Sequence, residues 1–283
     1  MLPLGAYNPS LIKFQQRLLM AYRHHDRKEG AWRTNLGIAE LGTDLKPIST
    51  KPIHAPEELK DNSFEDARLW IHQGTLWASF SISQWPTQEH RSIVAYGKLV
   101  EGKDSWSITS NHIPDYGQND FGACEKNWIF LSRGEKLFAL YLTYEEQVWI
   151  ELDGARVEEV QKAKALPWPY ATVHGGSICE GTNGNLLHVF NSHTSHRDRS
   201  LDRYLVGVAE LSGQPPFDML AISKRPVLVG TEGVCLDKNP HYKPNVVFVC
   251  GVVKTGNDQW LVSFGQNDHK CFLVKLGVAD LKL

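Results

Sequence analysis

Short apolar runs alternate with turn residues along the whole chain. Runs rich in Val, Ile, Leu, Phe and Trp include LLMAYR (18–23), LWASFS (76–81), KLFALYL (136–142), NLLHVF (185–190) and QWLVSF (259–264). Each run is too short for a typical helix. Another apolar run precedes each of them, and a Gly or a polar pair separates the two. This pattern predicts a series of β-hairpins.

The hairpins repeat at similar intervals. They begin near residues 8, 66, 127, 176 and 251, the first and last residues of each are 15 positions apart, and the steps are 58, 61, 49 and 75 residues. Repeats of this order are typical of radial β architectures. We therefore predict an all-β, five-bladed β-propeller that occupies residues 1–283 as a single domain, with blades starting near 8, 65, 125, 175 and 248. A two-sheet β-sandwich is the alternative, and the equal hairpins favour the propeller.

The longer steps predict insertions at 102–123, 153–173 and 192–203, and residues 153–165 are compatible with one short helix. Closure of the ring has two candidates. The segment Met1–Tyr7 and the C-terminal VADLKL are each able to supply an outer strand to the last blade.

Composition excludes several classes of function. The 283 residues include 30 Lys plus Arg and 32 Asp plus Glu, a net charge of −2, so we expect no nucleic-acid partner. No apolar run approaches the roughly 20 residues that span a bilayer, so we expect no membrane association, and the first residues lack a signal-peptide pattern. The five cysteines are widely spaced without a C-x-x-C pair, which favours a reducing, cytoplasmic location.

Polar residues recur where the first strand of a blade begins and the second ends, which is one face of an antiparallel hairpin. The predicted groups are Asn8 with Arg23, Glu65 and Asp66 with Ser81, Glu125 and Lys126 with Thr143, His174 and Gly175 with Asn191, and Cys250 with Asn267 and Asp268. Convergent polar groups of this kind predict a ligand-binding funnel.

The segment Phe64-Glu65-Asp66-Ala67-Arg68 is the sharpest candidate for chemistry, because Asp and Glu are poor strand formers. One interpretation is a surface turn with an Asp–Arg pair. The other makes Asp66 a general acid, with Glu65 and Arg68 holding substrate. Glycoside chemistry needs such a proton donor and stabilisation of an oxocarbenium-like centre.

Other positions have two interpretations each. Arg23 is a substrate or anion contact, or part of a solvated turn. Asn8 contacts a sugar hydroxyl or caps its strand, and His174 is a ligand or a structural histidine. The basic segment 193–203 is a solvated loop or an anion-binding lid carrying His193, Arg197 and Arg199. The histidines form no closed ligand set, and no nucleotide-binding fingerprint is present, so we predict no metal and no organic cofactor.

In chain order, the motifs NPSLI…LLMAYR, EDARLWI…LWASFS, EKNWIFL…LFALYL, HGGSI…LLHVFNSH, YLVGVAEL and VVFVCGVV…WLVSFGQND resemble glycoside hydrolase family 130 and its relatives. The resemblance covers residues 8–276. It implies a five-bladed propeller that acts with inversion on β-mannosides, as a phosphorylase or a hydrolase, or a related mannosyltransferase. Inorganic phosphate is then a possible co-substrate.

The resemblance also implies roles for single residues. Asp66, in the motif E-D-x-R, would be the proton donor and would act through a sugar hydroxyl. Asn8, Arg23, Glu65 and Arg68 would hold the sugar in the −1 site. Asp268, which closes Phe264-Gly265-Gln266-Asn267-Asp268, would bind sugar hydroxyls.

The chain departs from the family pattern in the phosphate site. The stretch 139–143 contains no cation, and Asn191 replaces a histidine, with His193 two residues later. Lys126, His193, Arg197 and Arg199 are the candidate substitutes. If water attacks instead of phosphate, a carboxylate must activate it, and Glu125 is the candidate base. Lys126, His174 and Asn191 complete the predicted substrate contacts.

Two other functions remain open. Five-bladed arabinanases and fructosidases use three acids from the first three blades, but the first blade here offers Asn8. A non-catalytic glycan-binding propeller is the second possibility, and the incomplete phosphate site motivates it.

Overall fold

The computed structural model describes residues 1–3, 5–28, 31–59, 62–83, 92–116, 125–142, 146–196, 202–232 and 242–283. Strands account for nearly all regular structure in these ranges, which confirms the all-β prediction. Two very short helices accompany them, η1 (Glu57–Leu59) and α1 (Val278–Leu281).

Within the described ranges, the strands form five antiparallel meanders. Their members, in chain order, are β1 (Tyr7–Phe14), β2 (Arg17–Lys28), β3 (Ala31–Leu41) and β4 (Pro47–His54); β5 (Ser63–His72), β6 (Thr75–Ser83), β7 (Ser92–Glu101) and β8 (Trp106–His112); β9 (Ile129–Arg133), β10 (Lys136–Leu142), β11 (Gln147–Asp153) and β12 (Arg156–Ala163); β13 (Thr172–Glu180), β14 (Leu186–His193), β15 (Tyr204–Leu211) and β16 (Met219–Ile222), with β17 (Leu228–Val229) on β15; and β18 (Val247–Gly256), β19 (Gln259–Gln266) and β20 (Lys270–Gly277). A parallel β4–β8 pair joins the first two meanders into one eight-stranded sheet.

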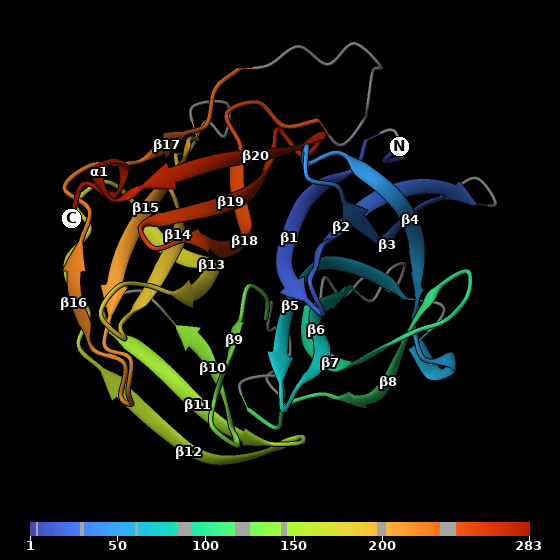
Figure 1. The fold of residues 1–283 in the computed structure, drawn as a ribbon, viewed down its shortest axis with the longest axis horizontal. Coiled ribbons are helices and arrows are strands. Elements are labelled where there is room, and N and C mark those ends of the chain that lie inside the picture. The colour runs from blue at the N-terminus through green and yellow to red at the C-terminus, as the bar shows by residue number, and fades with distance from the viewer. Residues whose placement is uncertain are drawn as a thin grey trace.

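The meanders are arranged around a common centre, and the first strand of each, β1, β5, β9, β13 or β18, lies innermost (Figure 1). Tight turns connect these inner strands to their partners. Gln15 and Gln16 have positive φ angles of 48° and 65°, and Gln73 and Gly74 have 49° and 70°. Two successive positive φ angles are typical of the type I′ turns that match strand twist. The predicted hairpins are therefore confirmed.

Apolar side chains fill the junctions between successive meanders. Trp106 and Phe80 belong to the core between the first and second meanders, and Trp149 belongs to the core between the third and fourth. Similar clusters lie at the second–third, fourth–fifth and fifth–first junctions. Burying a large apolar side chain contributes about 1.5–3 kcal/mol, so these junctions supply much of the stability.

Ring closure occurs directly between the first and last meanders. The Ser263 hydroxyl donates a hydrogen bond to the Pro9 carbonyl at 2.5 Å, and the Lys13 ammonium donates to the Lys254 carbonyl at 2.7 Å. Neither chain end adds a described strand to the last meander. Tyr7 begins β1, and the C-terminal segment forms α1 instead.

The short helix considered for 153–165 is wrong. Residues 156–163 form β12, the outermost strand of its meander. Most of its side chains are exposed or half-buried, because one face of an outermost strand meets solvent. Its polar sequence, RVEEVQKA, reflects this position.

Candidate active site

Each of the first four meanders has a residue with positive φ where its inner strand enters the ring. These residues are Asn8 (φ 49°), Asp66 (φ 53°), Asn127 (φ 68°) and Gly175 (φ 54°). Register breaks accompany three of them, in β1, β5 and β13. A bulge re-aims a side chain, and a left-handed L-residue costs about 1–2 kcal/mol, so such positions are typical of functional sites.

The bulges also change the predicted pairing. His174 faces Asn191 and Glu65 faces Ser81, as predicted. However, Tyr7, and not Asn8, faces Arg23. Cys250 lies in a bulge between Val249 and Gly251, so it has no partner of the predicted kind, because the extra residue shifts the register there.

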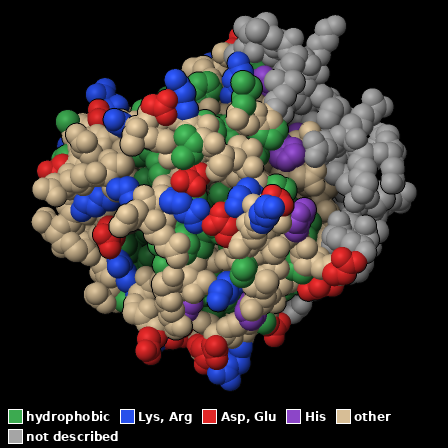
Figure 2. All heavy atoms as spheres, turned by 45° about the vertical axis from the view of Figure 1, so that its right-hand side comes forward, with side chains coloured by type: hydrophobic (Ala, Val, Ile, Leu, Met, Phe, Trp, Pro, Cys, Tyr) green, Lys and Arg blue, Asp and Glu red, His purple; other side chains and the backbone are tan. Residues whose placement is uncertain are grey.

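A cavity of about 560 Å³ opens at this end of the inner strands. Its lining consists of Tyr7, Asn8, Arg23, His25, Glu65, Asp66, Lys126, Asn127, His174, His193, Tyr204, Lys243, Val246, Phe248 and Asp268. Figure 2 shows acidic and basic side chains lying next to one another in the middle of one face of the molecule. The volume is in the range typical of small-molecule sites.

Asp66 lies at the centre of a buried polar network. Its Oδ1 atom accepts a hydrogen bond from Asn8 Nδ2 at 2.8 Å and lies 3.3 Å from the Arg23 Nη1 atom. The same Arg23 nitrogen lies 3.1 Å from Glu65 Oε2. Arg23 also stacks over the Tyr7 ring, with its guanidinium carbon 4.2 Å from the ring centroid.

The network determines the charge of Asp66. Burial alone would raise the pKa of this carboxyl, but the Arg23 and Arg68 guanidiniums and the Asn8 hydrogen bond outweigh it and hold the pKa below its usual value. Burial opposes the charge of Arg23, and the adjacent carboxylates of Asp66 and Glu65 overcome that effect and raise its pKa. Asp66 is therefore an anion at neutral pH.

Three buried atoms of this network have no hydrogen-bond partner within the described part of the chain. They are Asn8 Oδ1, Arg23 Nε and Arg23 Nη1. Arg23 Nη1 still forms ion pairs with Glu65 and Asp66. Buried polar atoms are normally hydrogen-bonded, so this network is held together by charge more than by complete hydrogen bonding.

Arg68, a predicted substrate contact, does not line this cavity but lies directly behind Asp66 and Asn127. Its Nε donates to the Gly176 carbonyl at 3.1 Å, and its two terminal nitrogens donate to the Asp66 carbonyl and to Asn127 Oδ1, both at 3.3 Å. The guanidinium thus reaches from the second meander to the third and fourth.

A chain of hydrogen bonds lies beside the network. The Tyr7 hydroxyl bonds to His25 Nε2, and the Thr34 hydroxyl bonds to His25 Nδ1 at 3.1 Å. Burial raises the pKa of Tyr7, so its hydroxyl stays protonated and serves as a hydrogen-bonding group.

The opposite wall contains histidines and lysines. Burial lowers the pKa of His174 to about 4, so this ring is neutral at pH 7. His193 packs on Tyr204 with ring centroids 4.5 Å apart, and its Nε2 lies 3.3 Å from Asp202. Lys243 pairs with Asp268 at 3.2 Å.

The charges of the lining balance. Arg23, Lys126 and Lys243 oppose Glu65, Asp66 and Asp268. With the neutral His174, amides and phenols, the lining offers many hydrogen-bond donors and acceptors without a large field of one sign. Such a surface suits an uncharged polyol.

Not every predicted residue lines this cavity. The Glu125 carboxylate instead accepts hydrogen bonds from Trp128 Nε1 at 3.1 Å and from the Tyr141 hydroxyl at 3.2 Å. Asn191 is fully buried, and its amide exchanges hydrogen bonds of 2.9 Å and 2.8 Å with the Val249 main chain. It therefore connects the fourth meander to the fifth. Arg197, Arg199 and Thr143 lie outside the described residues.

The sequence analysis missed several lining residues. Asn127 occupies the repeat position of Asn8 and Asp66, so the hairpin spacing was a usable signal for it. Tyr7 and His25 flank predicted positions, but bulges bring them to the cavity. No pattern in the sequence indicated that Lys243 and Phe248 would line the cavity.

Among the residues with described positions, no group of three or more His, Cys, Asp or Glu is placed to hold a metal ion. Neither short helix in the described ranges has the length or apolar character needed to cross a bilayer.

The chain shares its overall fold with solved structures of propeller enzymes that act on glycosides. The structure of a β-1,2-mannobiose phosphorylase from Listeria innocua, in complex with β-1,2-mannobiose, matches with a TM-score of 0.66 and 16% identity, over 98% of this chain and 91% of that one. A GDP-Man-dependent mannosyltransferase from Leishmania mexicana matches with a TM-score of 0.62 and 12% identity, over 96% of this chain and 85% of that one. A mannose phosphorylase from the same organism, in complex with phosphate, matches with a TM-score of 0.61 and 12% identity, over 96% of this chain and 84% of that one.

No protein-family model matches the chain, and no curated protein sequence matches it. At these identities the likeness shows the shared fold alone, and function rests on the residues of the site.

Proposed function

We propose that the protein forms or cleaves the glycosidic bond of a β-mannoside-like sugar, with inversion, in the cavity around Asp66. One observation carries this proposal. A buried, ionised carboxylate, supported by Asn8 and Arg23, lies at the centre of a charge-balanced polar cavity. The solved structures with this fold include mannoside phosphorylases and a mannosyltransferase, which supports the substrate class.

We also infer that the five meanders are the blades of a five-bladed propeller that spans residues 1–283 as one domain. Apolar clusters at all five junctions support this inference, since each meander packs on two neighbours. The axial cavity then belongs to all five blades.

Asp66 moves the proton in the proposed reaction. In bond formation its carboxylate accepts the proton of the attacking hydroxyl while the leaving group departs from the sugar C1 with the bonding electron pair. In cleavage phosphate attacks C1, the departing oxygen leaves with the bonding electron pair, and protonated Asp66 supplies its proton through a sugar hydroxyl, as the resemblance to family 130 implies. Glu65 and Asp268 stabilise positive charge that develops at C1.

The low pKa of Asp66 favours a second candidate, sugar transfer. A general base must be ionised before it accepts a proton, and Asp66 is ionised in the free protein. An anionic leaving group, either phosphate or a nucleoside diphosphate, would be held by Lys126 and His193, which line the outer part of the cavity. Arg197 and Arg199 are further candidates outside the described residues.

The geometry gives less support to hydrolysis with Glu125 as base. Both of its carboxylate oxygens accept hydrogen bonds from Trp128 and Tyr141, and it is not part of the lining. A base must be within hydrogen-bond reach of the water that it activates.

Product analysis tests the proposal. The protein is incubated with manno-oligosaccharides with and without phosphate, and separately with GDP-mannose and a sugar acceptor. A sugar 1-phosphate identifies a phosphorylase, free sugar a hydrolase, and transfer from GDP-mannose alone a transferase. Asp66→Asn must abolish whichever activity is found, whereas the exposed Asp44→Asn must not. Tight glycan binding with no product in any reaction contradicts the proposal.

A further inference from the structure

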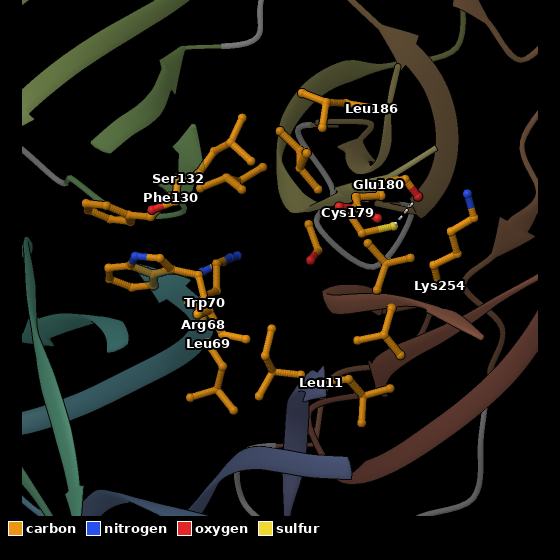
Figure 3. A pocket seen from close by; sticks show the side chains of 18 of the residues that line it. Leu11, Arg68, Leu69, Trp70, Phe130, Ser132, Cys179, Glu180, Leu186 and Lys254 are labelled. Atoms are coloured by element: carbon orange, nitrogen blue, oxygen red, sulfur yellow. Dashed lines mark hydrogen bonds between the residues drawn. The ribbon is translucent and has the colours of Figure 1, made fainter. Parts of the chain in front are cut away.

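A second cavity, of about 380 Å³, lies further along the same five inner strands. Its lining includes Leu11, Trp70, Phe130, Cys179 and Lys254, one from each inner strand (Figure 3). Arg68 lines this cavity, while its guanidinium is bound to Asn127 of the first cavity and to Gly176. Its side chain therefore separates the two spaces.

The wall of the second cavity is mainly apolar and partly aromatic. Trp70 and Phe130 stack with ring centroids 4.7 Å apart and planes inclined by 13°. Leu11 and Leu69 lie on neighbouring inner strands, and Figure 3 shows these side chains around an open centre. A wall of this kind favours a flat, apolar body over a sugar.

The charged residues of this cavity are unbalanced. Lys13, Arg133 and Lys254 oppose Glu180, and no ion pair joins any of these four to another described residue. Arg68 is a fourth cation of the lining, but its guanidinium is hydrogen-bonded to Gly176, Asp66 and Asn127. The other three cations face one carboxylate, an excess of two positive charges in a chain whose net charge is −2. A positive opening of this kind attracts anions.

Two buried donors of the lining lack acceptors. Trp70 Nε1 and Arg133 Nε have no hydrogen-bond partner among the residues that the structure describes. Both nitrogens donate only, but neither is accessible from the cavity, so an anion there is held by the charged groups of the lining, Lys13, Arg133 and Lys254. The side chain of Trp70 is only 6% exposed, so its indole nitrogen is shielded from bulk solvent.

We propose that this cavity is a binding site for a small aromatic carboxylate, separate from the sugar site. The aromatic body lies against Trp70 and Phe130, and the carboxylate faces Arg133 and the neighbouring lysines. This inference is independent of the proposed function, because it uses no residue that touches the reacting sugar.

Calorimetric titration with a matched pair of probes tests it. Naphthalene-2-carboxylate and naphthalene-2-carboxamide have nearly the same shape and differ in charge. We expect the carboxylate to bind once per chain and roughly tenfold or more tighter than the amide, since a charge-assisted hydrogen bond is about that strong. Arg133→Gln should remove most of this difference.

Two further variants locate the probe. Ile71→Trp fills the cavity and should abolish binding, whereas Lys275→Gln removes an exposed lysine on β20 and should leave binding unchanged. Thermal melts confirm that each variant is folded. The proposal is overturned if the carboxylate does not bind, if the amide binds equally well, or if binding survives both Ile71→Trp and Arg133→Gln. It is also overturned if Lys126→Gln, in the first cavity, abolishes binding while Arg133→Gln does not.

Discussion

Residues with positive φ angles occur at both ends of the inner strands, but they serve different purposes at the two ends. At the first end, Asn8 and Asp66 within their strands and Asn127 just before β9 adopt positive φ angles, and charged side chains gather around the axis. At the other end, positive φ angles occur at Gln15, Gln73 and Gly74 in exposed hairpin turns. The first set places side chains for binding, and the second only reverses the chain.

The comparison also extends to charge. Buried charges at the first end are paired, because an unpaired charge in a water-poor interior is costly. Near the turns, Arg17 forms half-exposed pairs with Glu40 and Glu101, which contribute little. We therefore expect equal substitutions to have unequal effects at the two ends.

The largest expected effect is on chemistry. Asp66→Asn should lower glycosidic activity roughly 10³-fold, because proton transfer by a positioned group contributes about 10²–10⁴-fold. Rates are measured on the substrate identified by product analysis, with Asp44→Asn as the control. Unchanged turnover in Asp66→Asn would show that another group moves the proton.

Arg17 and Arg23 belong to the same strand, β2, where Arg17 is the first residue and Arg23 lies near the middle. Arg23→Met should lower the free energy of unfolding by about 3 kcal/mol, because it leaves two carboxylates without their cation. Arg17→Met should cost at most about 1 kcal/mol. Denaturant unfolding measures both, and equal losses would contradict the comparison.

Arg23→Met should also shift the pH dependence of bond formation. Arg23 helps to hold the pKa of Asp66 low, so its loss raises that pKa. Because the ionised form acts as base, activity should fall at a higher pH in the variant than in the wild type. The same ion pair stabilises the fold at neutral pH, and that contribution is lost on acidification through the low pKa of Asp66.

Replacing a glycine by alanine should also cost different amounts of stability at the two ends. A Cβ at Gly176, where φ is 110°, would lie 2.2 Å from the Val189 carbonyl oxygen, whereas a Cβ at Gly74 meets nothing within 4 Å. Gly176→Ala should cost at least about 2 kcal/mol, from overpacking and an unfavourable φ. Gly74→Ala should cost only about 1 kcal/mol. Thermal unfolding of the pair provides the measurement.

The last expected effect is on how steeply the free energy of unfolding changes with pH. Burial lowers the pKa of His188 to about 4. Between pH 6.5 and pH 4 the unfolded chain binds a proton at this residue and the folded protein does not, so stability falls as the pH falls. His188→Gln should reduce the slope by about 1.4 kcal/mol per pH unit between pH 5 and 6. Unfolding free energies at several pH values test this, and an unaltered slope would contradict it.

The hairpins could be predicted because each inner and second strand is strongly apolar and each turn carries Gly or polar residues. The outer strands could not be predicted in the same way. β4 contains two prolines, and five of the eight residues of β12 are polar, since one side of each outer strand meets solvent. Their pairing depends on the neighbouring strand and not on a pattern of their own.

Part of the cavity lining was indicated by position in the hairpin repeat. Asn8, Arg23, Glu65, Asp66 and Asp268 are candidates from the sequence, and all five line the cavity. Two other candidates do not line the cavity, because neighbouring groups hold their side chains in hydrogen bonds. The Val249 main chain holds Asn191, and Trp128 and Tyr141 hold Glu125.

By itself, the sequence determined the all-β class, the hairpin repeat and the polar ends of the strands, because strand periodicity and turn chemistry act over a few residues. Only the tertiary structure decided which of those polar ends share a cavity, and that Asp66 is an anion there. Both depend on residues about 40–60 positions apart in the chain, such as Asp66 with Asn8 and with Arg23. Bulges and packing between meanders bring these residues together.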